Sequence, residues 1–400
     1  SRQIPVNVII EYRGQNIPEL KPGNHEVLII NTESRHIQPA KAASRIRNII
    51  IRAKASGVKY FYKKTDSTLR GNIGPELSAF LECIGCRQMS FIPANPGQKR
   101  YTRNGYQYLG NKLLHKTSFA NDPFEPVRTS FIPDILQKWF DPKILLVSRN
   151  DMERQSHILF PANGIMVIDC ISEKDLATAG KFLKRNRSLE AISGSAAFIK
   201  HLPSLLKLPK RKRTIKIPVG PVLVINGSVN QIALKQVRYV IKKGMEPIIL
   251  SKKLLSGRGN NYEAHMAQLR ELIKKDFKKK DILISSTDPV SPKDVSISQS
   301  ATKRPTSVNN TALRIGHVAY RLLKLMKIEK VLIIGGDTLA GLMKVMHCRQ
   351  IEPLSELLPG VALSIINHRG NKVFLFTKPG GFGEEDVIGK ILIKAGYFQK

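Results

Sequence analysis

The segment Lys63–Glu76 carries the polar groups needed to bind a small hydroxylated acid. Within one turn it gathers two cations, a carboxylate and two hydroxyls, which are Lys64, Asp66, Ser67, Thr68 and Arg70. Because the turn follows a predicted strand, it lies at the sheet edge where open α/β proteins bind ligands. Arginine can clasp a carboxylate through two charge-assisted hydrogen bonds, and Asp66 can accept from sugar hydroxyls. A turn held by an internal Asp66–Arg70 pair explains the same residues, so both interpretations stay open.

Three glycine-containing segments have the features of phosphate-binding turns. Gly335-Gly-Asp-Thr338 joins an apolar strand to a predicted helix, Lys378–Asp386 does the same, and Asn226-Gly-Ser228 ends a third strand. Glycines let a phosphate approach the backbone, and the free amides of a helix start can donate to it. Each segment alone is also explained as an ordinary strand-to-helix connection with a polar N-cap. Together the three favour a nucleotide-binding domain, although no Walker A sequence is present.

Metal and hydrolase motifs are weak or absent. Cys83-Ile-Gly-Cys86 has the spacing of a metal or redox pair, but no second pair exists, and Cys170 and Cys348 are isolated. We therefore predict structural cysteines and no metal ligands in the chain. No Gly-x-Ser-x-Gly segment supports a serine hydrolase. Of the nine histidines, only His36 falls near a candidate site.

The composition indicates a globular protein with a large positive charge. The 400 residues include 65 Lys and Arg against 31 Asp and Glu, giving a net charge of +34, and 42% are hydrophobic. No apolar run approaches the roughly 18 residues of a membrane span. Four cysteines do not make a disulfide framework, so we expect a cytoplasmic protein. The basic charge, densest in Lys207–Lys216, is typical of nucleic-acid binding or of a solvated surface, and its even spread favours the solvated surface.

Strand-like apolar runs alternate with helical patterns along most of the chain, which is typical of α/β proteins. The first half has predicted strands at Val6–Tyr12, Val27–Asn31, Tyr60–Lys63, Met89–Ile92, Ile144–Val147 and Ile165–Asp169, with helices at Pro39–Ser56, Pro75–Glu82 and from Glu173. The second half has predicted strands at Val222–Ile225, Pro247–Leu250, Ile282–Ser285, Val331–Ile334 and Lys372–Thr377, with helices at Gln231–Lys243, Tyr262–Lys279 and Ala312–Met326. The segment Pro203–Pro218 between them has no sustained period and reads as a linker. We predict two α/β domains with largely parallel sheets facing a central cleft.

These segments make the chain similar to the four-carbon acid sugar kinase family, whose members phosphorylate threonate, erythronate or 3-oxo-tetronate with ATP. The resemblance covers nearly the whole chain. It rests on Asn31-Thr-Glu-Ser-Arg35, Lys63–Glu76, Phe119–Arg128, Asn226-Gly-Ser228, Gly335-Gly-Asp-Thr338 and Lys378-Pro-Gly-Gly-Phe-Gly383. The sequence of Asp66–Gly74 is more similar to that of the threonate and erythronate kinases than to that of the 3-oxo-tetronate kinases. The resemblance therefore implies a cytoplasmic kinase acting on the terminal hydroxyl of D-threonate, with D-erythronate and 3-oxo-tetronate as alternatives.

The resemblance also implies which parts of the chain bind the acid and which bind the nucleotide. Residues 1–205 would form the sugar-acid-binding domain, residues 206–218 a basic linker, and residues 219–400 the nucleotide-binding domain. The implied substrate-binding residues are Arg35, Lys63, Lys64, Thr65, Asp66, Ser67 and Arg70. The implied nucleotide-binding residues are Ser228, Gly335, Gly336, Asp337, Thr338, Gly380 and Gly381. ATP and Mg²⁺ are the implied cofactors, and Asp337 is the candidate for the catalytic base or for a magnesium-linked role, by analogy with other sugar kinases.

One departure from the family concerns the beginning of the chain. Family members open with a strand followed by an Ala-Asp-Asp-(Leu/Phe)-Thr-Gly segment that contributes to the sugar-acid site. That segment is absent here, so we expect that the chain lacks the first residues of its gene product.

Two other classes remain as alternatives, a nucleic-acid-binding protein and a sugar-acid sensor without catalysis. The expected partners are an acid sugar and ATP, with neither membrane nor nucleic acid, and a homodimer is compatible with the sequence.

Overall fold

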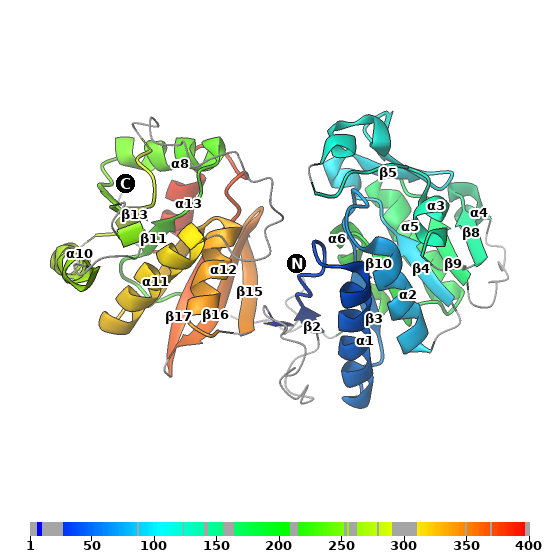
Figure 1. Ribbon diagram of the computed structural model, residues 1–400, viewed down its shortest axis with the longest axis horizontal. Coiled ribbons are helices and arrows are strands. Elements are labelled where there is room, and N and C mark those ends of the chain that lie inside the picture. Colours follow the sequence, from blue (N-terminus) through cyan, green and yellow to red (C-terminus); the bar gives the residue numbers. More distant parts are fainter. Residues whose placement is uncertain are drawn as a thin grey trace.

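The chain forms two α/β halves, each a sheet with helices packed against it (Figure 1). The computed structural model describes residues 6–9, 27–85, 88–122, 124–139, 143–154, 164–208, 215–251, 254–255, 262–277, 280–289, 310–348, 350–368 and 370–396. Among these residues, no helix combines the length and the apolar character needed to cross a membrane.

The N-terminal half contains a five-stranded parallel sheet with the order β3-β10-β4-β9-β8. Its strands are β3 (Phe61–Lys64), β4 (Gln88–Ile92), β8 (Lys143–Val147), β9 (Gly164–Ile168) and β10 (Ala191–Gly194). The helices are α1 (Pro39–Ala55), α2 (Ile73–Ile84), α3 (Ile132–Gln137), α4 (Arg149–Glu153), α5 (Glu173–Arg185), α6 (Ala196–Ile199) and α7 (Leu202–Leu205). A small antiparallel sheet of β5 (Arg100–Arg103), β6 (Tyr106–Leu109) and β7 (Lys112–Leu113) follows β4. The carboxyl ends of β3, β4, β9 and β10 therefore meet at one edge.

The C-terminal half is built on a larger mixed sheet with the order β12-β13-β11-β14-β17-β16-β15-β1-β2. Its strands are β11 (Leu223–Asn226), β12 (Pro247–Ile249), β13 (Ile282–Ser285), β14 (Lys330–Ile334), β15 (Gln350–Leu358), β16 (Val361–His368) and β17 (Asn371–Lys378). The helices are α8 (Gln231–Lys242), α10 (Tyr262–Asp276), α11 (Asn310–Leu325), α12 (Gly336–Val345) and α13 (Val387–Lys394). The neighbouring strands β12, β13, β11, β14 and β17 pair in parallel, whereas β15, β16 and β17 form an antiparallel meander. Consequently, β11, β14 and β17 end side by side at the same edge.

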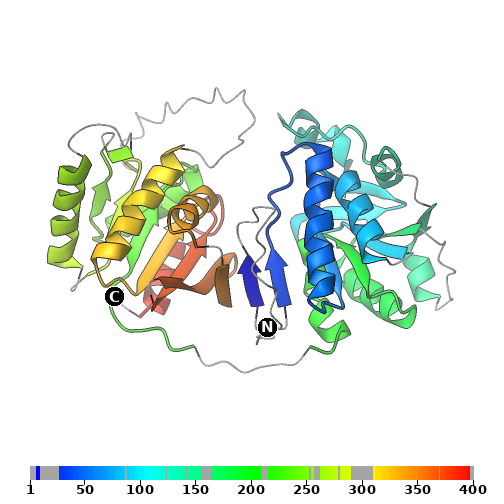
Figure 2. The ribbon, with the colours of Figure 1, turned by 60° about the horizontal axis from the view of Figure 1, so that its bottom comes forward.

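Two strands from the start of the chain complete the C-terminal sheet. Strand β1 (Val6–Ile9) pairs antiparallel with β15, and β2 (Val27–Ile30) pairs parallel with β1 (Figure 2). The chain then crosses to the N-terminal half, where α1 covers the other sheet. The two halves are thus joined through residues 31–38 as well as through the region after α7.

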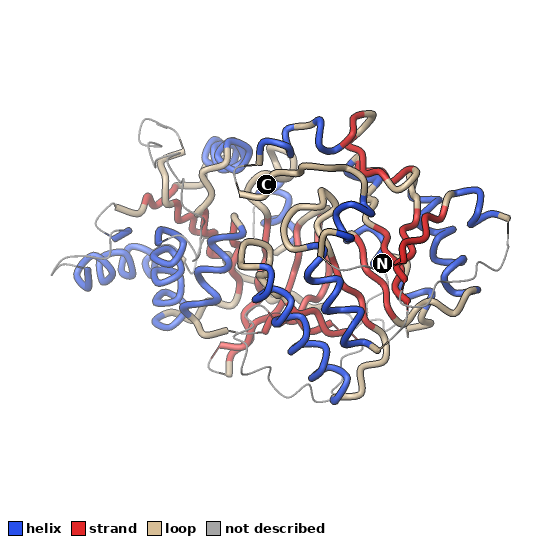
Figure 3. The backbone as a smooth tube through the Cα atoms, turned by 45° about the vertical axis from the view of Figure 1, so that its right-hand side comes forward, coloured by secondary structure: helices blue, strands red, loops and turns tan. Residues whose placement is uncertain are grey.

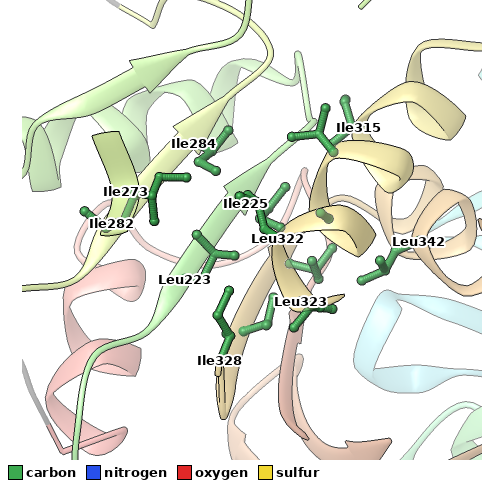
Figure 4. Packing of buried hydrophobic residues seen from close by; sticks show 14 of the residues in the cluster. Leu223, Ile225, Ile273, Ile282, Ile284, Ile315, Leu322, Leu323, Ile328 and Leu342 are labelled. Carbon is green, nitrogen blue, oxygen red and sulfur yellow. The ribbon is translucent and has the colours of Figure 1, made fainter. Parts of the chain in front are cut away.

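Hydrophobic clusters of described residues fill both faces of each of the two sheets. Helices α10, α11 and α12 cover one face of the C-terminal sheet, as Figure 4 shows for Leu322, Leu342 and their neighbours, and α8 and α13 cover the other. In the N-terminal half, α1, α2 and α3 cover one face, and α4, α5 and α6 cover the opposite face. The five-stranded sheet and the parallel strands of the larger sheet therefore lie between layers of helices (Figure 3). This layering leaves the strand ends as the places where polar turns meet.

The predicted fold class of two α/β domains with largely parallel sheets is confirmed. Local boundaries shift by a residue or two, since β3 ends at Lys64 and α2 runs from Ile73 to Ile84. The antiparallel strands β5–β7, β15 and β16 were not predicted. Parts of three predicted segments, residues 10–12, 209–214 and 278–279, lie outside the described residues. The domain boundaries and the cleft between the domains stay predictions.

Candidate functional site

The turn after β3 is organised around the carboxylate of Asp66. Asp66 accepts hydrogen bonds from the Thr68 backbone amide at 3.2 Å, from the Thr68 hydroxyl at 2.8 Å and from Arg70 Nε at 2.9 Å. A guanidinium nitrogen of Arg35 lies 3.3 Å from the same carboxylate. Desolvation raises the pKa of Asp66, but the Thr68 hydrogen bonds and the two arginine charges outweigh it, so the net pKa is lowered. Asp66 is therefore an ionised group that orients Arg35 and Arg70.

Arg70 is also held from the loop that follows β7. Its guanidinium donates to Asp122 at 2.8 Å and lies over the Phe119 ring, 4.9 Å from the centroid. Desolvation raises the pKa of Asp122, but hydrogen bonds from the Glu125 amide, Arg70 and the Phe124 amide bring it to about 2. Phe119 and Asp122, from the segment Phe119–Arg128, thus contact the Arg70 guanidinium in addition to Asp66.

Arg100, at the start of β5, joins this network. Its guanidinium donates to the Ser67 hydroxyl at 2.7 Å and lies 5.7 Å from the Phe119 centroid. Withdrawal from water lowers the pKa of Arg100. The Nε atoms of Arg100 and Arg35 are both buried, and neither has a hydrogen-bond partner among the described residues. These two donors could bind the oxygens of an anionic ligand.

The two adjacent lysines of β3 have different environments. Lys63 forms an ion pair with Glu76, and the two side chains are only 12% and 8% exposed. Lys64 is exposed to solvent and forms no ion pair with a described residue. Neighbouring protein nevertheless displaces hydration from its ammonium, which lowers its pKa, and Arg35 and Arg100 add to this effect while Asp66 opposes it. Lys64 is thus a cation that a ligand can pair with, whereas Lys63 already has a counterion.

The structure brings most of the predicted substrate residues together. Arg35, Asp66, Ser67 and Arg70 share one network, and Lys64 feels the charges of its members. Thr65 is buried, and its hydroxyl has no hydrogen-bond partner among the described groups. Arg100, Phe119 and Asp122 were not singled out from the sequence. Phe119 and Asp122 lie in a segment that carried the resemblance, but Arg100 had no sequence signal.

The nucleotide-type turns of the C-terminal half contact one another closely. Gly335 adopts φ +110 and precedes α12, which has no side-chain cap, so its first amides are free to donate. A Cβ on Gly227 would lie 2.1 Å from the Thr338 hydroxyl, and a Cβ on Gly380 would lie 2.2 Å from the Ser228 hydroxyl. Only glycine allows these approaches, which places the exits of β11, β14 and β17 in mutual contact.

Hydrogen bonds fix the same three turns. The Gly335 amide donates to the Lys378 carbonyl at 2.9 Å, and the Gly227 amide donates to the Ile334 carbonyl at 3.3 Å. The Ser228 amide donates to Asn226 Oδ1 at 3.2 Å. Gly336 and Asp337 are exposed in the first turn of α12, whereas Thr338 is buried. The predicted residues Ser228, Gly335–Thr338, Gly380 and Gly381 therefore lie along one sheet edge.

Family models and known proteins match both halves of the chain. Residues 5–202 match the sugar-binding N-terminal domain, and residues 223–388 match the nucleotide-binding C-terminal domain. The chain belongs to the four-carbon acid sugar kinase family. The members of this family are phosphotransferases, and the nucleotide-binding model matches the half that carries the glycine turns.

Similar curated proteins match between about half and nearly all of this chain. The chain is 26% identical over 375 residues to a D-threonate kinase of Salmonella typhimurium, covering 91% of this chain and 87% of that protein. It is 30% identical over 234 residues to a D-erythronate kinase of Heliobacterium modesticaldum, covering 55% and 52%. It is 23% identical over 393 residues to a 3-oxo-tetronate kinase of Cupriavidus necator, covering 94% and 88%.

Crystal structures of two bacterial proteins share the fold. One, from Haemophilus influenzae, has a TM-score of 0.79 at 19% identity and covers 97% of this chain and 93% of its own. The other, from Salmonella typhimurium, has a TM-score of 0.82 at 18% identity with the same coverage. At these identities the likeness concerns the fold alone.

Proposed function

We propose that this protein is an ATP-dependent kinase that phosphorylates the terminal hydroxyl of a four-carbon acid sugar, with D-threonate as the first candidate. The observation that carries the proposal is the cluster around Asp66, where Lys64 is free to pair and two buried guanidinium Nε atoms lack acceptors. Such a cluster suits a small carboxylate with several hydroxyls. The D-threonate kinases among the relatives match over most of this chain. D-erythronate and 3-oxo-tetronate are the alternative substrates.

In this proposal the N-terminal half holds the acceptor. Lys64, Arg35 and Arg100 bind the carboxylate of the acid, and Arg70 keeps its position through Asp66 and Asp122. Asp66 Oδ1 receives only the 3.2 Å hydrogen bond from the Thr68 amide among the described contacts, so it can also accept from a substrate hydroxyl. These contacts hold the acid so that its terminal hydroxyl stays free to react.

The C-terminal half holds the donor. The amides of Gly335–Thr338 and of the loop at Gly380 and Gly381 bind the phosphates, and Ser228 adds a hydroxyl. Mg²⁺ bound to the phosphates would neutralise charge during transfer. The acceptor oxygen forms a bond to the γ-phosphorus, the bond from that phosphorus to the β–γ bridging oxygen breaks, and Asp337 receives the hydroxyl proton. The products are the 4-phosphate of the acid and ADP.

A coupled ADP-release assay against threonates, erythronates and 3-oxo-tetronates tests the proposal. We expect one of these acids to support turnover well above the rate without acid, with D-threonate the best. ATP consumption that does not depend on any of the acids would overturn the proposal.

Asp337→Asn tests the assignment of the base. We expect kcat to fall by at least about 100-fold with little change in the KM for ATP, because general-base catalysis contributes at roughly this level. Near-normal turnover of this variant would remove Asp337 from the mechanism but not the kinase assignment.

A further inference from the structure

Lys378 is a buried cation without a buried anion. It ends β17 with 2% of its surface exposed, and its ammonium donates to the carbonyl of Pro379 at 2.6 Å. No ion pair with a described carboxylate is formed, and burial lowers the pKa of Lys378 to about 8. A buried ammonium is costly unless it is paired and hydrogen-bonded, so its placement here calls for an explanation. Here its task is to hold one peptide at the start of the glycine loop.

The geometry of that peptide decides where the next amide points. In a trans peptide, the carbonyl of one residue and the amide N–H of the next lie on opposite sides of the bond. The described residues contain no cis peptide. Because Lys378 binds the Pro379 oxygen from within the protein, the Gly380 N–H points away from Lys378. A cation on the oxygen also polarises the amide and strengthens it as a donor.

Gln236, fully buried on α8, acts in the same way farther along the loop. Its side-chain nitrogen lies 3.1, 2.8 and 2.8 Å from the carbonyl oxygens of Phe382, Gly383 and Glu384. The amides that follow the first two of these carbonyls, at Gly383 and Glu384, are therefore turned away from α8. Three converging carbonyls would repel one another without a donor between them.

A second buried lysine on the neighbouring strand lacks these features. Lys330 begins β14, is 1% exposed and donates to the Ala395 carbonyl at 2.8 Å. Burial lowers the pKa of Lys330 as well, but the charge of Asp281 opposes this effect. Lys330 thus has an anion nearby at the end of the sheet away from the glycine turns. Lys378, without one, lies at the end where the turns meet.

We propose that Lys378 and Gln236 are positioning residues that hold the carbonyls of the loop 379–384 toward the protein, so that its amides face the phosphates of the nucleotide. This inference rests on the proposed function for the identity of the anion. Neither residue contacts the substrate, and each acts through the loop. Lys378 also accepts the Gly335 amide through its own carbonyl, which couples the loop to the turn before α12.

Steady-state kinetics of Lys378→Met test the inference, with Lys372→Met as the control because Lys372 is exposed on the same strand. We expect the KM for ATP to rise by about tenfold, with less than about twofold change in the KM for the acid. For the wild type, kcat/KM for ATP should fall as pH rises through about 8, because the protonated ammonium orients the loop best. In Lys378→Met this alkaline decrease should vanish. Equal changes in both KM values, or an unchanged pH profile, would overturn the inference.

Gln236→Leu tests the second residue with nearly the same side-chain volume. We expect a similar increase in the KM for ATP, while the alkaline decrease due to Lys378 remains. Thermal unfolding of each variant shows whether the fold is kept. An unchanged KM for ATP in a folded Gln236→Leu protein would remove Gln236 from the proposal.

An NMR titration gives a readout that does not depend on kinase activity. Labelling proline with ¹³C and glycine with ¹⁵N selects the four Pro–Gly pairs of the chain, of which Pro379–Gly380 is one. We expect the Gly380 amide signal to shift with a midpoint near pH 8 in the wild type and to stay constant in Lys378→Met. A constant wild-type signal would overturn the positioning role. A titrating signal in a protein that fails to use ATP would instead overturn the proposed function.

Discussion

The two candidate sites of this protein differ in how they would bind negative charge. The N-terminal site uses side chains, with Arg35, Arg70 and Arg100 held by Asp66, Asp122 and Ser67. The C-terminal site uses the backbone, with turns at the ends of β11, β14 and β17 that pack too closely for a Cβ at Gly227 or Gly380. The first arrangement suits a ligand with one carboxylate and several hydroxyls. The second suits the phosphates of a nucleotide, whichever base they carry. Specificity for the acid should therefore reside in side chains, and affinity for the nucleotide in loop geometry.

Among the variants that distinguish the two sites, removal of a cation from the N-terminal site should give the largest effect. We expect Lys64→Met to lose about 2–3 kcal/mol of binding to the acid, roughly 30- to 150-fold in its kcat/KM, because a charge-assisted contact disappears. The KM for ATP should stay unchanged. Lys59→Met, at an exposed lysine before β3, is the matched control. A similar loss for both substrates would mean that the two sites are not separate.

Adding a side chain to a glycine of the C-terminal site should give the next largest effect, and this effect should concern ATP. The Cβ of Gly380→Ala would lie 2.2 Å from the Ser228 hydroxyl, so the loop must shift. We expect the KM for ATP to rise by about tenfold and the KM for the acid to stay constant. Gly389→Ala in α13 is the control, since its Cβ would meet only Tyr239 at 3.8 Å. A constant KM for ATP would contradict the assignment of this loop to the phosphates.

The network of the N-terminal site should also contribute to stability in a pH-dependent way. The pKa of Asp122 is lowered to about 2 in the folded protein, below the roughly 3.9 of an unfolded chain. Its contribution is therefore present above about pH 4 and is lost as the pH falls toward 2.

Urea unfolding of Asp122→Asn measures this contribution. We expect the variant to be about 1–2 kcal/mol less stable at pH 7 and equal to the wild type near pH 2. Asp134→Asn, at an exposed aspartate of α3, should show no such difference. A stability difference that persists unchanged at low pH would mean that the charge of Asp122 is not its cause.

The smallest expected effect is a change of overall size. Residues 31–38 join β2 in the C-terminal sheet to α1 on the N-terminal half and carry Arg35, so a substrate bound at Arg35 touches the connection between the halves. We expect a slight decrease in the radius of gyration by X-ray scattering only when the acid and a non-hydrolysable ATP analogue are both present. A radius that stays constant with both ligands would contradict closure.

Much of the fold could be predicted from local sequence patterns. Continuous apolar runs such as Val331–Ile334 indicate parallel strands, because a strand buried on both faces needs apolar residues at every position. Helical periodicity indicates α1 and α8, because a helix buried on one face has apolar residues at every third or fourth position. The glycine turns were also visible, since their function depends on residue type and position after a strand. The meander of β15 and β16 was not predicted, because its strands are long, mixed in polarity and set by partners far away in the chain.

The site itself was only partly predictable from the sequence. Local spacing singled out Lys63 and Lys64 equally, but the structure pairs Lys63 with Glu76 and leaves Lys64 exposed. Arg100 comes from another strand, and the tertiary fold brings it to Ser67, 33 residues away in the sequence. Gln236 and Lys378 have ordinary neighbours in the sequence. The proposed role of Gln236 depends on contact with Phe382, 146 residues away, and that of Lys378 depends on its burial.

By itself, the sequence determined the chemistry that is available: a polar turn after one strand, three glycine turns after others, and two α/β patterns that place those turns at strand ends. Only the tertiary structure decided which charges neutralise each other and which remain free for a ligand. It also decided that β1 and β2 would join the C-terminal sheet. The physical reason is that ion pairing, burial and strand pairing act between neighbours in space, and these interactions decay over a few ångströms whatever their separation in the sequence.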